Sequence, residues 1–216
     1  MSLLTLSFDN GPDPRVTPRV LDVLASHAIP AWFFVLGKNL VSDEGRRLVE
    51  RARDAGHLIG NHSFTHSIPL GEDARPDAVE EEIAATDELL APLVSAPKRF
   101  RPFGGGGRLG PHLLSPRAVD HLCARQYSCV LWNSVPGDWL DPAGWPEKAL
   151  QDCALRPHTL MVLHDIPDAC LEGLDGFLVR AKALGLRFTT ECPPDCVPIV
   201  EGRIVGDLSG LVAASG

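Results

Sequence analysis

Residues 31–36, Ala31-Trp32-Phe33-Phe34-Val35-Leu36, form a continuous apolar run bounded by Pro30 and Gly37. Strands that are apolar at every position are typical of parallel sheets, which are buried on both faces. Because parallel strands need long crossover connections, a helix is expected on each side of this run. The run therefore predicts a parallel sheet whose strands are joined by helices.

The segments on both sides of this run repeat the same order of strand and helix. The expected strands are 3–8, 31–36, 57–60, 99–101, 127–132, 159–163 and 186–190. The first expected helix begins at Thr17, which is expected to cap it. The other expected helices are 42–55, 76–94, 115–125, 146–155 and 171–184.

About seven alternations of strand and helix predict an α/β fold, either an open doubly wound sheet or a closed (β/α) barrel. No G-x-G-x-x-G follows the first strand, which disfavours the dinucleotide-binding fold. The tail 197–216 has a mixed pattern that predicts no particular element.

The bulk composition describes a globular, acidic chain. It has 216 residues, a formal net charge of −8 and a pI near 5.4, with 44% hydrophobic and 22% charged residues. We expect one domain over 1–216, with a core at about 3–190 and a tail at 191–216. The charge disfavours nucleic acid and anionic membrane as partners, and no apolar run approaches the roughly 20 residues of a membrane span.

The N-terminal segment has no basic stretch or cleavage site and leads directly into the first strand, so we expect no signal peptide and a cytoplasmic protein. None of the six cysteines forms a C-x-x-C pair, and reduced thiols are expected. Cys192 and Cys196 are close enough in sequence to bridge or to bind a metal, but two free thiols in a proline-stiffened loop are the favoured interpretation.

Two histidines lie four residues apart in Gly60-Asn61-His62-Ser63-Phe64-Thr65-His66. If this segment forms one helical turn, both imidazoles lie on one face. Two neutral imidazoles can bind a divalent metal and leave open positions for water and substrate. Such a spacing also arises by chance, and two solvated loop histidines are the alternative.

Polar residues follow most of the predicted strands at their carboxyl ends. They are Asp9, Asn10, His62, His66, Arg101, Asp138, Trp139, His164 and Asp165. In a barrel the carboxyl ends of the strands meet at one rim, where functional residues collect. The series therefore predicts a site at that rim.

At these residues the chain resembles the polysaccharide deacetylases, carbohydrate esterase family 4, which are built on the NodB-homology domain. The resemblance covers about residues 3–190 and five motifs in order. The motifs are 7–12 (S-F-D-N-G-P), 62–66 (H-S-F-T-H), 100–104 (F-R-P-F-G, one Pro shorter than the family motif), 132–139 (ending in D-W) and 162–165 (V-L-H-D).

The resemblance implies a distorted (β/α) barrel and metal-assisted removal of an acetyl group from a sugar. It implies that His62, His66 and Asn10 hold a divalent metal, with zinc expected, and that the substrate is a small molecule or an oligosaccharide. Asp9 would be the base, Arg101 would pair with it, and His164 would be the general acid. The expected substrate-binding residues are Trp139, Leu163, Phe103 and Asp138, with Trp139 and Leu163 forming an apolar wall.

Two positions depart from the family pattern. Asn10 replaces the Asp that is the third metal ligand, and an uncharged amide is a poorer donor to zinc. Three outcomes follow: a weaker site with Asn10 or water as third ligand, Asp9 recruited as a ligand, or no metal. Val135 stands where an acid is common, which leaves acidic support for His164 open.

These departures leave two hypotheses. The first is an amide hydrolase that removes an N-acetyl or other N-acyl group from an amino sugar or a small amide. The second is a degenerate member that binds a glycan or small ligand without turnover. Asn10 favours the second, whereas an intact set of Asp9, Arg101 and His164 favours the first.

Overall fold

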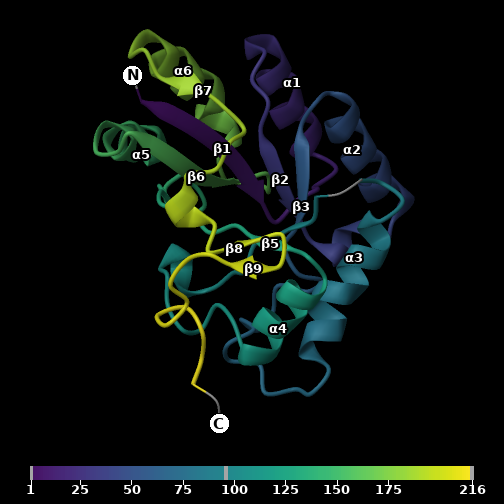
Figure 1. The fold of residues 1–216 in the computed structure, drawn as a ribbon. Helices are drawn as coiled ribbons and strands as arrows, with labels where there is room; N and C mark the ends of the chain where they lie inside the picture. Colours follow the sequence, from purple (N-terminus) through teal and green to yellow (C-terminus); the bar gives the residue numbers. More distant parts are fainter. Residues whose placement is uncertain (1, 95–96, 215–216) are drawn as a thin grey trace.

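The computed structural model describes residues 2–94 and 97–214, and within them nine strands form one sheet (Figure 1). The strands are β1 (Leu3–Asp9), β2 (Trp32–Val35), β3 (Leu58–Asn61), β4 (Arg99–Phe100), β5 (Ser128–Cys129), β6 (His158–His164), β7 (Arg187–Phe188), β8 (Ile199–Val200) and β9 (Arg203–Ile204). Their order is β6-β1-β2-β3-β4-β5-β8-β9, and β7 pairs with β1. The first seven strands pair in parallel, and β8 and β9 pair antiparallel.

The sheet curls back on itself beyond β5. Ser134 forms a parallel bridge to Met161 of β6, and its carbonyl accepts the N–H of Val162 at 2.9 Å. The two ends of the parallel sheet are thereby joined over a short stretch. Of the two predicted architectures, the distorted barrel is confirmed.

The helices lie outside the strands (Figure 1). They are α1 (Thr17–His27), α2 (Asp43–Asp54), α3 (Ala85–Leu90), α4 (Pro116–Ala124), α5 (Trp145–Ala154) and α6 (Leu171–Ala183), with short turns η1 (Gly37–Leu40), η2 (Glu80–Ala84), η3 (Gly105–Gly107) and η4 (Pro194–Cys196). Ser42 caps α2, as predicted, by accepting the N–H of Gly45 at 3.0 Å. No described helix is both long and apolar enough to cross a membrane.

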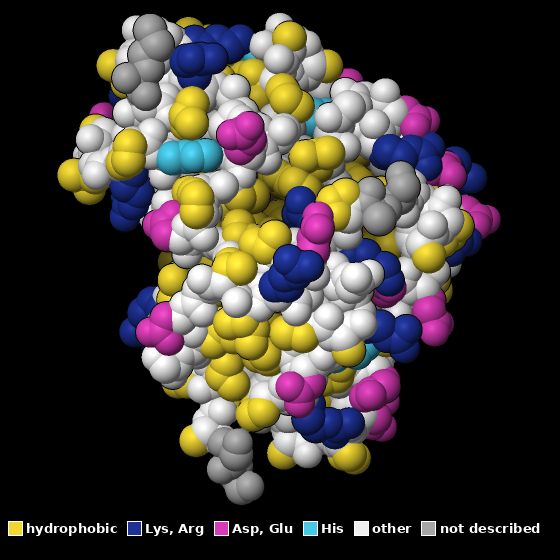
Figure 2. All heavy atoms as spheres, in the orientation of Figure 1, with side chains coloured by type: hydrophobic (Ala, Val, Ile, Leu, Met, Phe, Trp, Pro, Cys, Tyr) yellow, Lys and Arg dark blue, Asp and Glu magenta, His cyan; other side chains and the backbone are white. Residues whose placement is uncertain are grey.

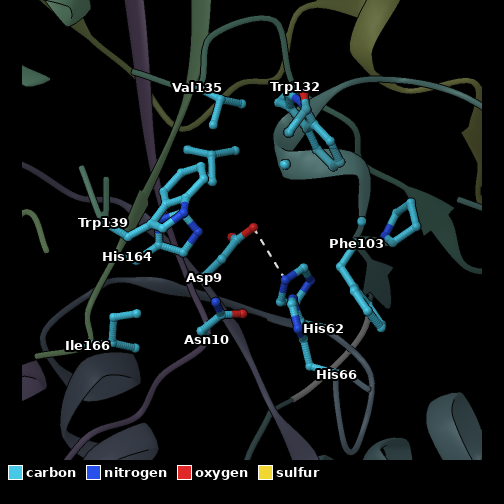
Figure 3. Close-up of a pocket in the computed structure, with 15 residues that line it drawn as sticks. Asp9, Asn10, His62, His66, Phe103, Trp132, Val135, Trp139, His164 and Ile166 are labelled. Carbon is cyan, nitrogen blue, oxygen red and sulfur yellow. Dashed lines mark hydrogen bonds and ion pairs between the residues drawn. The ribbon is translucent and has the colours of Figure 1, made fainter. Parts of the chain in front are cut away.

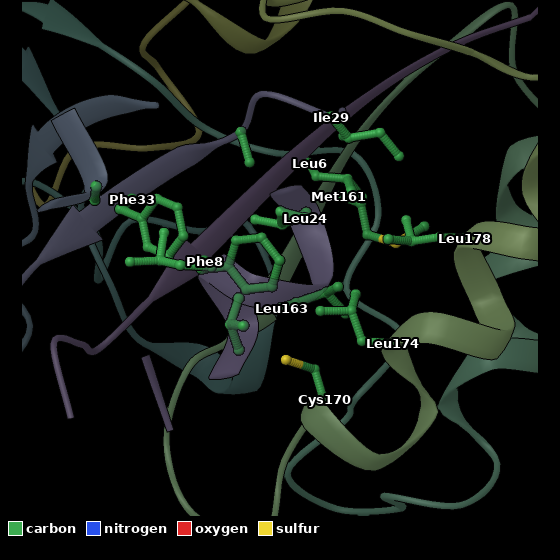
Figure 4. Packing of buried hydrophobic residues seen from close by; sticks show 14 of the residues in the cluster. Leu6, Phe8, Leu24, Ile29, Phe33, Met161, Leu163, Cys170, Leu174 and Leu178 are labelled. Carbon is green, nitrogen blue, oxygen red and sulfur yellow. The ribbon is translucent and has the colours of Figure 1, made fainter. Parts of the chain in front are cut away.

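Alternation along β1 sends its side chains to the two faces of the sheet in turn. The residues Leu4, Leu6 and Phe8 of β1 pack with the helices outside the barrel (Figure 4). The intervening side chains, Ser7 and Asp9 among them, point to the opposite face of the sheet, because successive strand residues alternate. The barrel interior holds a smaller cluster of Trp32, Phe34, Val130, Leu160 and Cys196. Alternation therefore aims the last residue of β1 at the barrel mouth.

Three local predictions were wrong. Residues 76–94 are not one α-helix, because a π-helical turn, η2, precedes α3. Thr17 does not cap α1; its hydroxyl accepts the N–H of Asp13 at 2.8 Å and donates to Asp165. Strands β4 and β5 are also shorter than predicted, with two residues each.

The tail contains a structured hairpin that sequence patterns did not identify. Strands β8 and β9 pair with each other, and β8 pairs with β5. Cys192 and Cys196 are free thiols in the structure. The face that carries β8 and β9 is hollowed, and hydrophobic side chains form most of the wall of the hollow (Figure 2).

Candidate active site

A cavity of about 250 Å³ opens at the carboxyl ends of the strands (Figure 3). It is lined by Asp9, Asn10, His62, His66, Pro102, Phe103, Gly104, Gly106, Gly107, Trp132, Val135, Trp139, Val162, His164 and Ile166. Seven of the ten predicted site residues therefore border one space, and an eighth, Arg101, is buried and bonded to Asp9.

Asp9 ends β1 and is held by a buried arginine. The guanidinium of Arg101, which is 0% exposed, donates to Asp9 Oδ1 at 2.8 Å and to the Ser7 hydroxyl at 2.6 Å. It also donates to the carbonyls of Val130 and Leu131, both at 3.2 Å. These bonds satisfy the buried cation on several sides, as its burial requires. The expected pair is present, and it leaves Asp9 Oδ2 free to face the cavity.

The segment 62–66 is a loop and not a helical turn, yet it still brings its histidines together. Ser63 and His66 have positive φ angles of 73° and 58°, which fold the loop back. The two imidazole centroids lie 5.1 Å apart, and the ring of His66 stacks on Phe103 at 3.8 Å. The condition of a helical turn is not met, because Ser63 and His66 have left-handed and not helical backbone angles.

Both imidazoles are uncharged, so each has a ring nitrogen that can bind a metal ion. His62 Nδ1 lies 2.9 Å from the carbonyl oxygen of Arg101, so this nitrogen carries the donated proton and Nε2 faces the cavity, 3.5 Å from Asp9 Oδ2 (Figure 3). Burial lowers the pKa of His62. Burial, followed by the neighbouring His62, lowers the pKa of His66 to about 3. Neutral imidazoles of this kind suit a divalent cation.

Asn10 supplies the remaining polar atom at this side of the cavity. It adopts a left-handed conformation with φ of 76°, and its carbonyl accepts from the Asn39 side chain at 3.0 Å. Its Oδ1 is buried and has no hydrogen-bond partner among residues 2–94 and 97–214. Within the same residues, no group of three or more His, Cys, Asp or Glu side chains could hold a metal. Two neutral imidazoles and an unpartnered amide oxygen are nevertheless ligand types that divalent cations accept.

His164 ends β6 and is held by Asp138. Its Nδ1 donates to Asp138 Oδ1 at 2.9 Å, and its backbone N–H donates to Oδ2 at 2.8 Å. Burial alone would lower the pKa of His164, but the hydrogen bond and charge of Asp138, together with Asp9 and Asp165, raise it above its ordinary value. Trp139 packs edge-on against the imidazole with centroids 4.7 Å apart.

Asp138 is therefore not a substrate-binding residue, and that prediction was wrong. It is 0% exposed, and both of its carboxylate oxygens are taken by His164. It supplies the acidic support that Val135, which lines the cavity, does not provide. The sequence left this support open at Val135, and Asp138 in the same loop provides it.

Leu163 does not form the cavity wall, and this prediction was also wrong. It is 0% exposed and packs in the outer core with Phe8 and Cys170 (Figure 4). Because β6 alternates, its neighbours Val162 and His164 line the cavity instead. Val162, Trp139 and Phe103 make the apolar wall.

Asp165 is a buried carboxyl that was identified in the sequence but received no role. It is 1% exposed and accepts the Thr17 hydroxyl at 2.5 Å, and burial raises its pKa to about 7. A Cβ at Gly11 would lie 2.1 Å from its Oδ2. Asp165 therefore packs directly against the turn that follows Asn10. Only glycine at position 11 leaves room for this contact.

Comparisons with known proteins point to one family. A family model described as polysaccharide deacetylase matches residues 2–108. A chitooligosaccharide deacetylase of Rhizobium leguminosarum bv. phaseoli is 32% identical over 189 residues, which cover 85% of this chain and 77% of the relative.

Two solved structures share the fold. The Bc1960 peptidoglycan N-acetylglucosamine deacetylase is 27% identical with a TM-score of 0.74, over 93% of this chain and 90% of that one. A family 4 acetyl xylan esterase from Clostridium thermocellum, in complex with a cobalt ion, is 30% identical with a TM-score of 0.70, over 87% of each chain.

Proposed function

The chain belongs to the polysaccharide deacetylase family, and we propose that it is a hydrolase that removes an N-acetyl group from an amino sugar. One observation carries the proposal. A carboxylate, Asp9, and an imidazole, His164, border the same cavity, and each is fixed by its own buried partner. A binding protein needs neither a held base nor a held acid, whereas amide hydrolysis needs both.

Asp9 acts as the base in this proposal. Arg101 occupies Oδ1, so Oδ2 is the oxygen that accepts a proton from the attacking water. Figure 3 shows Asp9 between His164 and Trp139 on one side and the histidine pair on the other. A water near Oδ2 is therefore flanked by the acid and by the two imidazoles.

His164 acts as the general acid. Asp138 takes the proton-bearing Nδ1, which leaves Nε2 directed away from Asp138 and available to protonate the departing amine nitrogen. Asp138 raises the pKa of His164, which favours the protonated ring that this role requires. The water oxygen bonds to the acetyl carbon and the C–N bond breaks, while Asp9 takes one proton from water and His164 gives one to nitrogen, so that acetate and a free amine are released.

His62, His66 and the Asn10 amide oxygen would hold a divalent cation, with zinc as the proposed ion. When bound there, such a cation supplies a Lewis acid for the acetyl carbonyl and lowers the pKa of bound water from about 15.7 toward about 7. The related esterase from Clostridium thermocellum was solved with cobalt. His62 and His66 remain uncharged near neutral pH, as this role requires.

The remaining walls suit a small acyl group and one face of a sugar ring. Every polar side chain that lines the cavity is one of the five residues already given a role: Asp9, Asn10, His62, His66 and His164. The other lining side chains are apolar, aromatic or glycine. Recognition would therefore rest on stacking against Trp139 and Phe103, which favours a short oligosaccharide or a small molecule as substrate.

A second candidate function is ligand binding without turnover. The observation that favours it is Asn10, which carries no charge where the family pattern has an Asp. A cation held by two imidazoles and one amide would bind more weakly than one held by a carboxylate.

The test is release of acetate from short N-acetylglucosamine oligomers by protein supplied with Zn²⁺, with an Asp9→Ala variant as the control. The proposal expects acetate release by the wild type and none by the variant. If both proteins bind the oligomer and neither releases acetate, the hydrolase is excluded and the binding function stands.

A further inference from the structure

Glu82 is a buried carboxylate that the proposed reaction does not use. It lies in the π-helical turn η2, and its side chain is 1% exposed. π-Helical turns are rare and occur frequently at functional sites. A buried carboxylate also requires strong hydrogen-bond donors. The donors to Glu82 come from the loop that carries the two cavity histidines.

Glu82 binds the backbone between those histidines. Its Oε2 accepts the N–H of Phe64 at 3.0 Å and the N–H of Thr65 at 2.8 Å. Its Oε1 accepts the Thr65 hydroxyl, and the Arg75 guanidinium lies 3.7 Å from the same oxygen. One side chain therefore fixes two consecutive peptide groups of the loop.

The opposite edge of the loop is held by Gly37 and Lys38. Three carbonyls of residues 63–65 accept hydrogen bonds there: two from backbone N–H groups at 2.9 and 3.0 Å, and one from the Lys38 ammonium at 3.0 Å. The N–H of residue 63 donates to Asn61 Oδ1 at 3.0 Å. All backbone groups of residues 63–65 thus have partners, and Glu82 accepts two of the three N–H groups.

The loop needs this support because its conformation is unfavourable by itself. Ser63 and His66 have positive φ angles, and non-glycine residues keep such angles only where their surroundings hold them. Without Glu82, the N–H groups of Phe64 and Thr65 would lose their acceptor. The loop would then relax, and His66 would move relative to His62.

We propose that Glu82 is a positioning residue that sets the spacing of His62 and His66 for a divalent cation, acting through the backbone of Phe64 and Thr65. The inference rests on the proposed function, because it takes the two imidazoles as ligands of that cation. Glu82 does not border the cavity, so it has no role as a ligand or as a proton carrier.

The first experiment compares metal-free variants by NMR of the histidine rings. The ring of His66 stacks on Phe103 at 3.8 Å, so its proton shifts report its position. Glu82→Ala is expected to move these shifts, whereas Glu82→Gln is expected to retain them, because its amide can still accept from the loop and donate to Thr65. Glu81→Ala is the matched control, since Glu81 lies on the same turn, is half exposed and pairs with Arg75.

The second experiment titrates Co²⁺ into the same proteins and follows its visible absorption. Glu82→Ala is expected to weaken binding by about tenfold or more, as removal of a group that orients a metal ligand does. Glu82→Gln should stay within about threefold of the wild type, and Glu81→Ala should be unchanged. If Glu82→Ala does not fold, Thr65→Val takes its place. It removes one of the three hydrogen bonds from the loop to Glu82, and Co²⁺ affinity should fall about threefold.

Two results would overturn the inference: equal shifts and affinities in Glu82→Ala and Glu81→Ala, or a Glu82→Gln variant as impaired as Glu82→Ala. If the wild type binds no Co²⁺, the metal site of the proposed function fails. The histidine shifts of the metal-free variants then still decide whether Glu82 positions the pair.

Discussion

The two ends of the barrel differ in what their cavities contain. At the amino ends of β2–β5 lies a cavity of about 770 Å³, larger than the one of about 250 Å³ at the carboxyl ends. Its residues include Trp32, Arg99 and Val200, and the nearest side-chain partner of Arg99 is the Ser128 hydroxyl at 3.4 Å. At the carboxyl end, Asp9 and its partner are buried and closely bonded.

The two cavities differ in fixed charge more than their sizes suggest, and the proposed reaction belongs to the smaller cavity, which has the buried charged pairs. Burying ionised groups is costly unless each is paired. The carboxyl end contains two such buried pairs, Asp9–Arg101 and His164–Asp138. Among the described residues, the amino-end cavity has no comparable pair: Arg99 has no carboxylate within ion-pairing distance.

The largest expected effect is at the carboxyl end, for Asp9→Asn. The variant loses the base, and general bases contribute about 10²–10⁴-fold, so kcat/KM for acetate release should fall about a thousandfold. It also leaves the buried Arg101 without its counter-charge, which should cost about 3 kcal/mol of unfolding free energy. Acetate release and urea unfolding measure the two effects. A variant within tenfold of the wild-type rate would remove Asp9 from the role of base.

Asp138→Asn should change how the rate of acetate release depends on pH. The charge and hydrogen bond of Asp138 raise the pKa of His164, and a general acid works only while protonated. Activity should fall as pH rises through that pKa, and the variant, with a lower pKa, should lose activity at lower pH than the wild type. At pH 7 a loss of about 10–100-fold is expected.

The control is Asp175→Asn at an exposed carboxylate paired with His27, which should keep the wild-type profile. The same raised pKa means that the protonated His164 stabilises the fold at low pH, and that this contribution is lost as pH rises through the folded-state pKa. An unshifted profile in Asp138→Asn would show that His164 is not the acid.

Asn10→Asp should have a smaller effect, since it adds a carboxylate to the carboxyl-end cavity. A charged oxygen is a better ligand than an amide for a divalent cation, so affinity for Zn²⁺ should rise by about tenfold, or roughly 1.4 kcal/mol. Calorimetric titration of both proteins measures this. Equal affinities would mean that residue 10 is not a ligand.

The smallest effect is expected at the amino end. Arg99→Gln removes a cation from the larger cavity, and acetate release should remain within about twofold, with unfolding free energy within about 0.5 kcal/mol. A tenfold loss of activity would show that the amino end takes part in the reaction, and the contrast between the two ends would fail.

Much of this site followed from sequence because strand ends and motifs are local features. Asp9 and His164 are the last residues of their strands, and parallel strands bring such ends together. Alternation along β6 also excludes Leu163 once His164 is placed in the cavity, so that error was avoidable.

The contributions of Asp138 and Glu82 could not be read from sequence. Asp138 reaches His164 from a loop 26 residues away, and Glu82 reaches the histidine loop from 17 and 18 residues away. Such contacts depend on tertiary packing, which no periodicity encodes. The π-helical turn that carries Glu82 was likewise hidden in an apparently regular helical pattern.

The decisive experiment for a metal-dependent hydrolase is acetate release from N-acetylglucosamine oligomers during stepwise addition of Zn²⁺ to chelator-treated protein. Activity should be absent at first, rise in proportion to the bound ion and level off at about one ion per chain. Full activity without metal would contradict the assignment of His62 and His66 as ligands. One bound ion without acetate release would contradict the hydrolase itself.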